Sequence, residues 1–213
     1  MRLFAGVFLY ALGVVVTLQA DIGYAPWDVF HAGLAKTTGI SIGTASILVG
    51  LVLLIICALL RERLGLGTVL NIVAIGVFID IILALRIIPL SNGPVIGGVM
   101  LVVGLFTIAL ASYFYIGSGF GAGPRDSLMV ALTRKTKKPV GVCRAAVEVT
   151  AVVVGWLLGG MVGVGTIASA FGIGFCVQVT FRLFQFDATV VGHETLTQTG
   201  HMLLTMLRKP ADK

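Results

Sequence analysis

One motif occurs twice in this chain, at a fixed distance. Residues 20–28 read ADIGYAPWD and residues 118–126 read SGFGAGPRD, so a glycine, a proline and an aspartate recur 98 residues later. The same register pairs other residues: Gly6 with Gly104, Gly43 with Gly141, Gly76 with Gly174, and Gly65, Gly67 and Thr68 with Gly163, Gly165 and Thr166. Such matches are rarer by chance than matches among Leu, Val and Ala. The sequence therefore predicts an internal duplication of residues 1–92 as 93–185, followed by a cytoplasmic tail at 186–213.

Six apolar runs are long enough to cross a membrane. Of all residues, 58% are hydrophobic and only 11% are charged, whereas soluble domains have about 25% charged residues. A transmembrane helix needs about 20 apolar residues. Runs of this kind lie at 3–19, 42–60, 67–88, 94–116, 140–158 and 164–185. The predicted fold is an all-α polytopic membrane protein with six transmembrane helices, three in each repeat, in contact with the lipid bilayer.

The distribution of charges predicts the orientation of the two repeats. Because each repeat has an odd number of spans, the second must enter the membrane from the opposite side, which gives inverted-topology repeats. With a cytoplasmic N-terminus, most of the 15 lysines and arginines fall in cytoplasmic segments, and only Lys36 and Arg86 lie outside. This bias fits the positive-inside rule and places both termini in the cytoplasm. It also accounts for the net charge of +6 without a nucleic-acid partner.

The repeated motif opens a short helix between the first and second span of each repeat. Proline suits the first turn of a helix, and the carboxylates of Asp28 and Asp126 would face the positive end of the helix dipole. Two interpretations stay open. The motif is either a turn into a capped helix that lies at the interface, or a re-entrant element whose free N–H groups face a water-filled cavity or an anionic solute.

A second repeated motif, glycine-any-glycine-threonine, opens the third span of each repeat at residues 65–68 and 163–166. In the first copy it follows Arg61 and Arg63 and precedes Asn71, a combination that could bind an anion at a helix N-terminus. Small residues at this spacing also let membrane helices pack closely, and the second copy lacks the arginines. We favour close packing and keep Asn71 as a candidate for solute binding.

Ionisable residues inside the spans are the strongest candidates for function. Glu148 lies eight residues beyond Val140, which puts it about 12 Å deep, near the bilayer midplane. Arg144 is one turn away and could pair with Glu148 at i,i+4 spacing, and Asp80 lies in the outer half of another span. Their counterparts in the other repeat are uncharged. The Arg144–Glu148 pair is either structural or a site of solute or proton coupling, and we favour the second interpretation.

The remaining residue types give no sign of catalysis or metal binding. The three cysteines fall within spans, where they behave as small apolar residues. The three histidines, His31 among them, are isolated in the sequence and predicted to be interfacial or soluble. The sequence has no nucleophile triad, no paired carboxylates in one span and no phosphate-binding loop. We therefore expect no enzymatic activity, no metal and no cofactor.

Several segments resemble one bacterial family. The motif at 20–28, the run LGLGTVLN at 64–71, the run GAGPRDSLM at 121–129, and Arg144 followed by Glu148 are similar to YczE/YyaS/YitT-type integral membrane proteins, in particular the YczE branch. The resemblance extends over most of both repeats. It implies a multi-pass protein of the bacterial cytoplasmic membrane, and it implies no particular activity.

The leading hypothesis is a small secondary transporter that moves an unidentified small solute, with anions among the candidates, bound between the repeats near the midplane. The alternative is a non-transporting membrane scaffold or accessory protein. A polar cavity that reaches Glu148 would favour the first, and a dry core with an exposed small-residue face the second. The small size of the chain favours a homodimer. The candidates for solute binding or coupling are Glu148, Arg144, Asp80, Asn71, Asp28 and Asp126.

Overall fold

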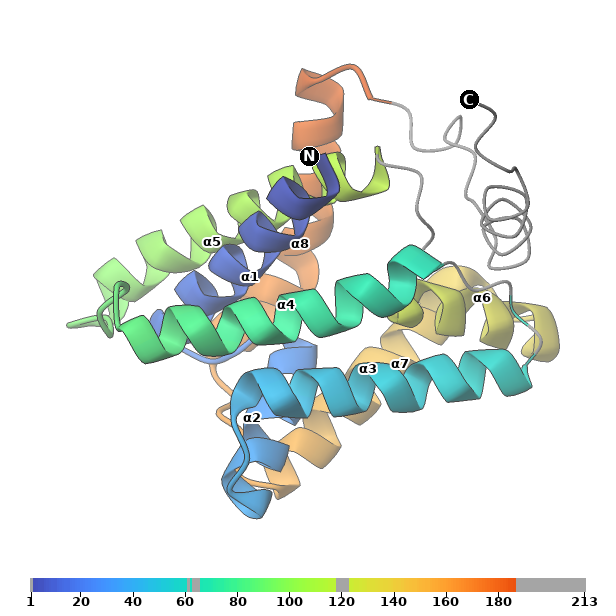
Figure 1. The fold of residues 1–213 in the computed structure, drawn as a ribbon, viewed down its shortest axis with the longest axis horizontal. Coiled ribbons are helices and arrows are strands. Elements are labelled where there is room, and N and C mark those ends of the chain that lie inside the picture. Colours follow the sequence, from blue (N-terminus) through green and yellow to red (C-terminus); the bar gives the residue numbers. More distant parts are fainter. Residues whose placement is uncertain (1, 61, 63–65, 118–122, 187–213) are drawn as a thin grey trace, which may run out of the picture.

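The computed structural model of the chain describes residues 2–60, 62, 66–117 and 123–186. This part consists of eight α-helices and contains no strand (Figure 1). The helices are α1 (Arg2–Gln19), α2 (Pro26–Thr38), α3 (Ile42–Leu59), α4 (Leu66–Leu85), α5 (Pro94–Ile116), α6 (Pro124–Thr136), α7 (Val140–Leu157) and α8 (Val164–Leu183). The predicted tail lies outside the described residues from position 187 onward.

The helices repeat in the register of the sequence. The bounds of α2, α3 and α4 recur 98 residues later as those of α6, α7 and α8. All the helices except α2 and α6 have the length and hydropathy of membrane spans, and they match the six predicted runs. Proline begins both short helices, because its fixed φ angle suits the first helical turn and its missing N–H has no partner there. The six-span, all-helical fold is therefore confirmed.

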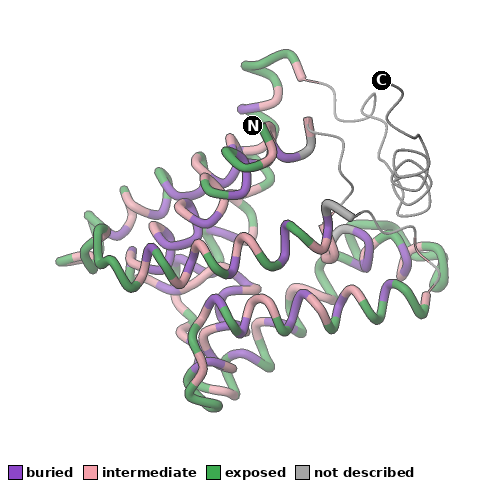
Figure 2. Tube along the Cα trace, viewed as in Figure 1, coloured by how far each residue is buried: buried purple, intermediate pink, exposed green. Residues whose placement is uncertain are grey.

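The outer surface of the bundle is apolar. The long helices leave many large apolar side chains exposed, including those of Leu59, Val95 and Phe171. Exposed and buried positions alternate along each helix with the helical period (Figure 2). Water would solvate such a surface poorly, whereas the hydrocarbon of a bilayer is as apolar as these side chains. The surface is that of a protein in contact with the lipid bilayer.

Helices α1 and α5 pack closely against each other. Glycines let the two helices approach closely: a Cβ on Gly13 would lie 2.9 Å from the carbonyl oxygen of Gly104, and a Cβ on Gly104 would lie 2.5 Å from Cγ2 of Thr17. Helix α4 packs on α1, and α8 packs in the same way on α5. Buried apolar residues of α1, α4 and α5, among them Val15, Ile79 and Ile108, form one cluster.

The short helices α2 and α6 lie at opposite ends of α3 (Figure 1). Helix α2 leads directly into the N-terminus of α3. Nη2 of Arg134, in the last turn of α6, donates a hydrogen bond to the carbonyl oxygen of Leu60 at the other end of α3, over 2.7 Å. The C-terminal ends of α2 and α6 therefore lie near opposite ends of a helix that is long enough to span a membrane. Inverted repeats require this arrangement.

Cysteine labelling tests the orientation in the membrane. Lys36 and Arg134 are both exposed and occupy the C-terminal turns of α2 and α6. In a background with the three native cysteines replaced by alanine, we expect Lys36→Cys to react with a membrane-impermeant maleimide added to intact cells, because the charge distribution places position 36 outside. Arg134→Cys should react only after permeabilisation. Labelling of both positions from the same side would contradict the inverted topology.

The two repeats differ in how their last two spans pack. Helices α3 and α4 pack closely, and a Cβ on Gly43 would lie 2.0 Å from the carbonyl oxygen of Gly76. Between α7 and α8, both fully described, there is no comparable packing. A Cβ on their counterparts Gly141 or Gly174 would meet none of the described atoms within 4 Å. Within the described residues, α3 and α4 thus form a closely packed pair and α7 and α8 do not.

Candidate functional site

A cavity of about 360 Å³ lies between the helices, and all eight of them contribute to its wall. This volume falls in the range of pockets that hold small molecules. The polar and charged part of the wall comes from both repeats and includes Asp28, His31, Asn71, Arg125, Arg144 and Glu148. Four of the predicted candidates therefore meet in one place: Asp28, Asn71, Arg144 and Glu148. The cavity carries these polar groups among apolar ones and reaches Glu148, which is the observation that favours solute binding over a dry scaffold.

Both short helices begin at this cavity. Ala25 precedes α2 and Gly123 precedes α6 with nearly the same backbone conformation, φ −60° and ψ 152° against φ −62° and ψ 154°. Both of these residues and the prolines that follow them line the cavity. Neither helix start has a side-chain cap among the described residues. The positive ends of two helix dipoles therefore face the same cavity, which is the arrangement that the re-entrant interpretation of the motif expects.

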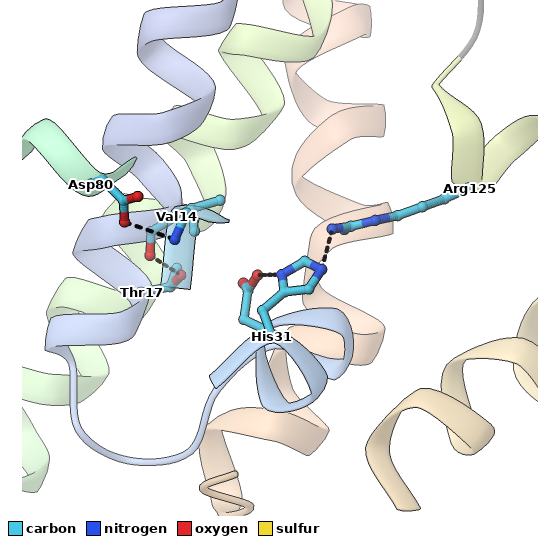
Figure 3. A network of polar contacts seen from close by, with 7 residues as sticks. Val14, Thr17, His31, Asp80 and Arg125 are labelled. Atoms are coloured by element: carbon cyan, nitrogen blue, oxygen red, sulfur yellow. Dashed lines mark hydrogen bonds and ion pairs between the residues drawn. The ribbon is translucent and has the colours of Figure 1, made fainter. Parts of the chain in front are cut away.

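Polar contacts connect the two repeats across the cavity (Figure 3). Oδ1 of Asp28 lies 3.3 Å from Nδ1 of His31, one turn further along α2. Nη2 of Arg125, on α6, lies 3.4 Å from Nε2 of the same imidazole. A guanidinium can only donate, so Nε2 accepts, and the proton of the neutral ring resides on Nδ1, which donates it to Asp28. His31 thus links a carboxylate of the first repeat to a cation of the second.

His31 belongs to the site: the residue is isolated in the sequence, but in the structure it is 1% exposed and lies between Asp28 and Arg125. Burial lowers the pKa of the imidazole below its ordinary value of 6.5; the hydrogen bond with Asp28 acts against this shift, and the charge of Arg125 adds to it. The sequence did contain a signal, since Asp28 and His31 are three residues apart and share one helix face. Arg125 is 94 residues away along the chain, where no such spacing rule applies.

The lowered pKa of His31 makes the stability of the protein depend on pH. Below pH 6.5 the unfolded chain binds a proton at this position while the folded protein does not, so stability falls as pH falls toward the folded-state pKa. We expect the parent to lose up to about 1.4 kcal/mol per pH unit from this residue. His31→Asn keeps a donor for Asp28 but cannot titrate, and its thermal stability in detergent should fall less between about pH 7 and pH 5. The other titratable cavity groups, Asp28 and Glu148, are unchanged in this comparison. Equal slopes for the two proteins would contradict the prediction.

Arg125 presents a cation to the cavity. Its guanidinium carbon lies 4.8 Å from the ring centroid of Trp27, a cation–π contact that covers one face of the group. No carboxylate whose position the structure describes forms an ion pair with Arg125. The side chain of Asp126, the neighbouring candidate, lies outside the described part of the structure. The guanidinium is therefore held by an aromatic ring and a neutral imidazole.

The predicted ion pair within α7 is present. Nε of Arg144 lies 2.8 Å from Oε1 of Glu148, with side-chain exposures of 47% and 21%. Both side chains line the cavity. The two side chains are therefore a partly exposed carboxylate and guanidinium in the wall of the cavity.

Asn71 lies on the cavity wall with an unused acceptor. The residue is 8% exposed, and its Oδ1 has no hydrogen-bond partner among the described residues. A buried polar atom of this kind costs about 1–3 kcal/mol when it is left unpaired. The two arginines that the sequence grouped with it, at positions 61 and 63, lie outside the described residues. Asn71 lines the same cavity as the charged residues Asp28, Arg125 and Glu148.

The second copy of the glycine-any-glycine-threonine motif packs against the loop before α2. The N–H of Gly165 donates a hydrogen bond to the carbonyl oxygen of Ile22 over 2.8 Å. A Cβ on Gly163 would lie 2.5 Å from the same oxygen, and one on Gly165 would lie 2.6 Å from the carbonyl oxygen of Gly23. Close packing accounts for both glycines of this copy.

Asp80 is separated from the other candidates and does not line the cavity. Its carboxylate accepts hydrogen bonds from the hydroxyl of Ser41 and from the backbone N–H of Gly43, the latter over 2.8 Å. Ser41 and Gly43 are the N-cap and second residue of α3, so Asp80 joins α4 to the positive end of the α3 dipole. These contacts account for a carboxylate in an apolar span.

Replacing Asp80 should therefore affect stability alone. Asp80→Asn removes the charge that faces the start of α3, and we expect it to lower the free energy of unfolding by about 1–3 kcal/mol. Thermal unfolding in detergent measures this loss. Gln178 occupies the equivalent place in the second repeat and is exposed, so Gln178→Asn should have little effect. A loss of solute binding by Asp80→Asn without a loss of stability would contradict this role.

Comparison with known proteins gives a consistent picture. The model of a family of unknown function, DUF6198, matches residues 1–182. The chain is 36% identical over 170 residues to the uncharacterized membrane protein YczE of Bacillus subtilis, covering 78% of each chain. It is 32% identical over 177 residues to an uncharacterized protein of Haemophilus influenzae, covering 81% of this chain and 80% of the other. The uncharacterized protein YyaS of B. subtilis is 28% identical over 166 residues, or 76% and 82% of the two chains. No solved structure matches.

Proposed function

The chain belongs to DUF6198, a family of unknown function, and we propose that it is a small secondary transporter that moves an unidentified small solute across the bacterial cytoplasmic membrane. In this proposal the two repeats have inverted topology, both termini are cytoplasmic, and the solute binds in the cavity between the repeats. Catalysis of a covalent reaction is not part of the proposal.

The observation that carries this proposal is the polar wall of the cavity. Ionisable groups inside a membrane protein are costly, and they persist where they face a water-filled space or a substrate path. Here Asp28 and His31 from one repeat face the same cavity as Arg125, Arg144 and Glu148 from the other. Secondary transporters built from inverted repeats bind their solutes at this kind of place, between short helices that begin at membrane depth.

A membrane scaffold or accessory protein is the alternative. A scaffold needs an exterior that recognises a partner and gains nothing from a polar cavity between its repeats. The many exposed apolar side chains are spread around the bundle and suit lipid as well as protein. The cavity therefore favours transport over a scaffold role.

A metabolite comparison tests the proposal. Small molecules would be measured inside and outside cells that lack the protein, that produce it, and that produce Glu148→Gln at the same level. We expect at least one small metabolite to change its distribution with the parent protein and to return to the control distribution with Glu148→Gln. If no metabolite differs between cells with and without the parent protein, the transporter proposal is rejected.

A further inference from the structure

We infer that the solute is a small carboxylate that also bears a hydroxyl or amino group: Arg125 binds the carboxylate, and Asn71 accepts a hydrogen bond from the second group. The inference rests on the proposed function, because it names the chemistry of the solute bound in the same cavity. The two residues come from different repeats, Asn71 from α4 and Arg125 from α6.

The surroundings of Arg125 are suited to an anion that approaches in the plane of the guanidinium. The ring of Trp27 covers one face of the group, and His31 accepts from a single nitrogen, Nη2. A guanidinium has five N–H donors in one plane, and carboxylates pair with it edge-on through two of them. A carboxylate of the solute would then neutralise the charge of Arg125, which has no ion-pair partner among the carboxylates that the structure describes.

The two acidic residues of the cavity wall whose side chains are described have other partners than the guanidinium of Arg125. The carboxylate of Glu148 is paired with Arg144 at 2.8 Å, and that of Asp28 is 3.3 Å from the Nδ1 of His31. The starts of α2 and α6 line the same cavity and add the positive ends of two helix dipoles. These helix starts and the guanidinium of Arg125 together offer positive groups to an anionic part of the solute.

Asn71 supplies the second, independent requirement. Its Oδ1 is buried and has no hydrogen-bond partner within the described part of the chain, and the residue lines the cavity that Arg125 also lines. An acceptor in this state selects a ligand that brings an N–H or O–H group, because any other ligand leaves the oxygen unpaired. A plain carboxylate satisfies Arg125 alone, whereas a hydroxy- or amino-carboxylate satisfies both residues.

Binding to the purified full-length protein in detergent tests the inference. The probes are racemic lactate, alanine and racemic mandelate, each with a carboxylate and a donor group. Propionate and phenylacetate lack the donor, and 1,2-propanediol and 1-phenylethane-1,2-diol lack the carboxylate. Affinity is measured from the concentration dependence of the thermal unfolding temperature. We expect at least one of the first three probes to bind, and its matched compounds to bind at least about tenfold more weakly.

Variants assign the two contacts. Arg125→Gln should weaken binding of that probe by at least about tenfold, whereas Arg86→Gln, an exposed arginine away from the cavity, should not. Asn71→Leu should remove the preference for a donor group while plain carboxylates still bind. The unfolding temperature without probe reports whether each variant folds. Arg125→Lys keeps the charge, loses the planar fork, and should also bind more weakly, so it replaces Arg125→Gln if that variant does not fold.

Three results would overturn the inference: none of the three donor-bearing carboxylates binds, Arg125→Gln or its lysine substitute binds as the parent does, or Asn71→Leu keeps the preference for a donor.

The metabolite comparison separates this inference from the proposed function. A transported metabolite without a carboxylate would contradict this inference and would still support the proposed transport function. Binding of lactate, alanine or mandelate without any transported metabolite would support the site and reject transport.

Discussion

Replacing Glu148 with glutamine should yield a protein that folds like the parent and no longer moves its solute. Glu148 lies near the middle of a span, is partly exposed to the cavity, and pairs with Arg144 over 2.8 Å. Glutamine has nearly the same shape and keeps an oxygen for Arg144, so the free energy of unfolding should change by less than about 1 kcal/mol, the usual value of a solvent-accessible ion pair. The charge is what the variant loses. The variant leaves Arg144 without the carboxylate that pairs with it in the wall of the cavity.

Two measurements check this prediction together. Thermal unfolding in detergent reports the fold, and the metabolite distribution in cells reports transport at equal protein levels. Asp80→Asn is the matched control, because it also removes one carboxylate from a span, but from the start of α3 and away from the cavity. It should lower stability and leave transport per folded molecule unchanged. If Glu148→Gln transports normally while Glu148→Ala does not fold, Glu148 is structural.

Gly43→Ala should be the most destabilising small substitution in the spans. A Cβ at this position would lie 2.0 Å from the carbonyl oxygen of Gly76 and 2.5 Å from the carboxylate carbon of Asp80. Both neighbours are fixed, one as backbone and the other as the acceptor for the N–H of Gly43 itself. Helices α3 and α4 would have to move apart, and we expect a loss of about 3 kcal/mol or more, at the upper end of overpacking effects.

The internal duplication supplies the control for this experiment. Gly141 is the counterpart of Gly43, occupies the same position in α7, and has open space around its Cβ site. Gly141→Ala should therefore be neutral or should stabilise the protein by about 0.4–1 kcal/mol, because alanine restricts the unfolded chain more than glycine does. Fluorescence-detected size exclusion and thermal unfolding would compare the two variants. Equal effects at positions 43 and 141 would mean that the two helix pairs pack alike.

Much of the fold could be predicted because the bilayer and the duplication both constrain it. A span needs a fixed length of apolar residues, so the six runs delimit the long helices to within a few residues. The prolines at 26 and 124 mark the starts of the short helices, since proline is favoured there. The difference in packing between the repeats could not be predicted, because Gly43 and Gly141 are the same residue type at equivalent positions of the two repeats. It depends on whether the backbone of a neighbouring helix lies against the glycine, as that of Gly76 does against Gly43.

The candidate site was predictable where its contacts are local. Arg144 and Glu148 are one helical turn apart, and this spacing alone predicts their pairing. His31 and Arg125 were missed because their contact joins α2 to α6 and depends on the way the repeats face each other. Asp80 was predicted as a candidate for solute binding or coupling because a carboxylate in an apolar span suggests function. Its hydrogen bond with the N–H of Gly43, at the start of a neighbouring helix, could not be predicted from the spacing of the two residues in the sequence.

The unequal packing of the two helix pairs has a mechanical consequence. Separating α3 from α4 would break the contacts of Asp80 with Ser41 and Gly43 and pull apart two backbones that touch through glycine. Among the described residues, no comparable contacts join α7 to α8. The two repeats share their helix bounds, yet we expect the α3–α4 pair to resist separation more strongly than the α7–α8 pair.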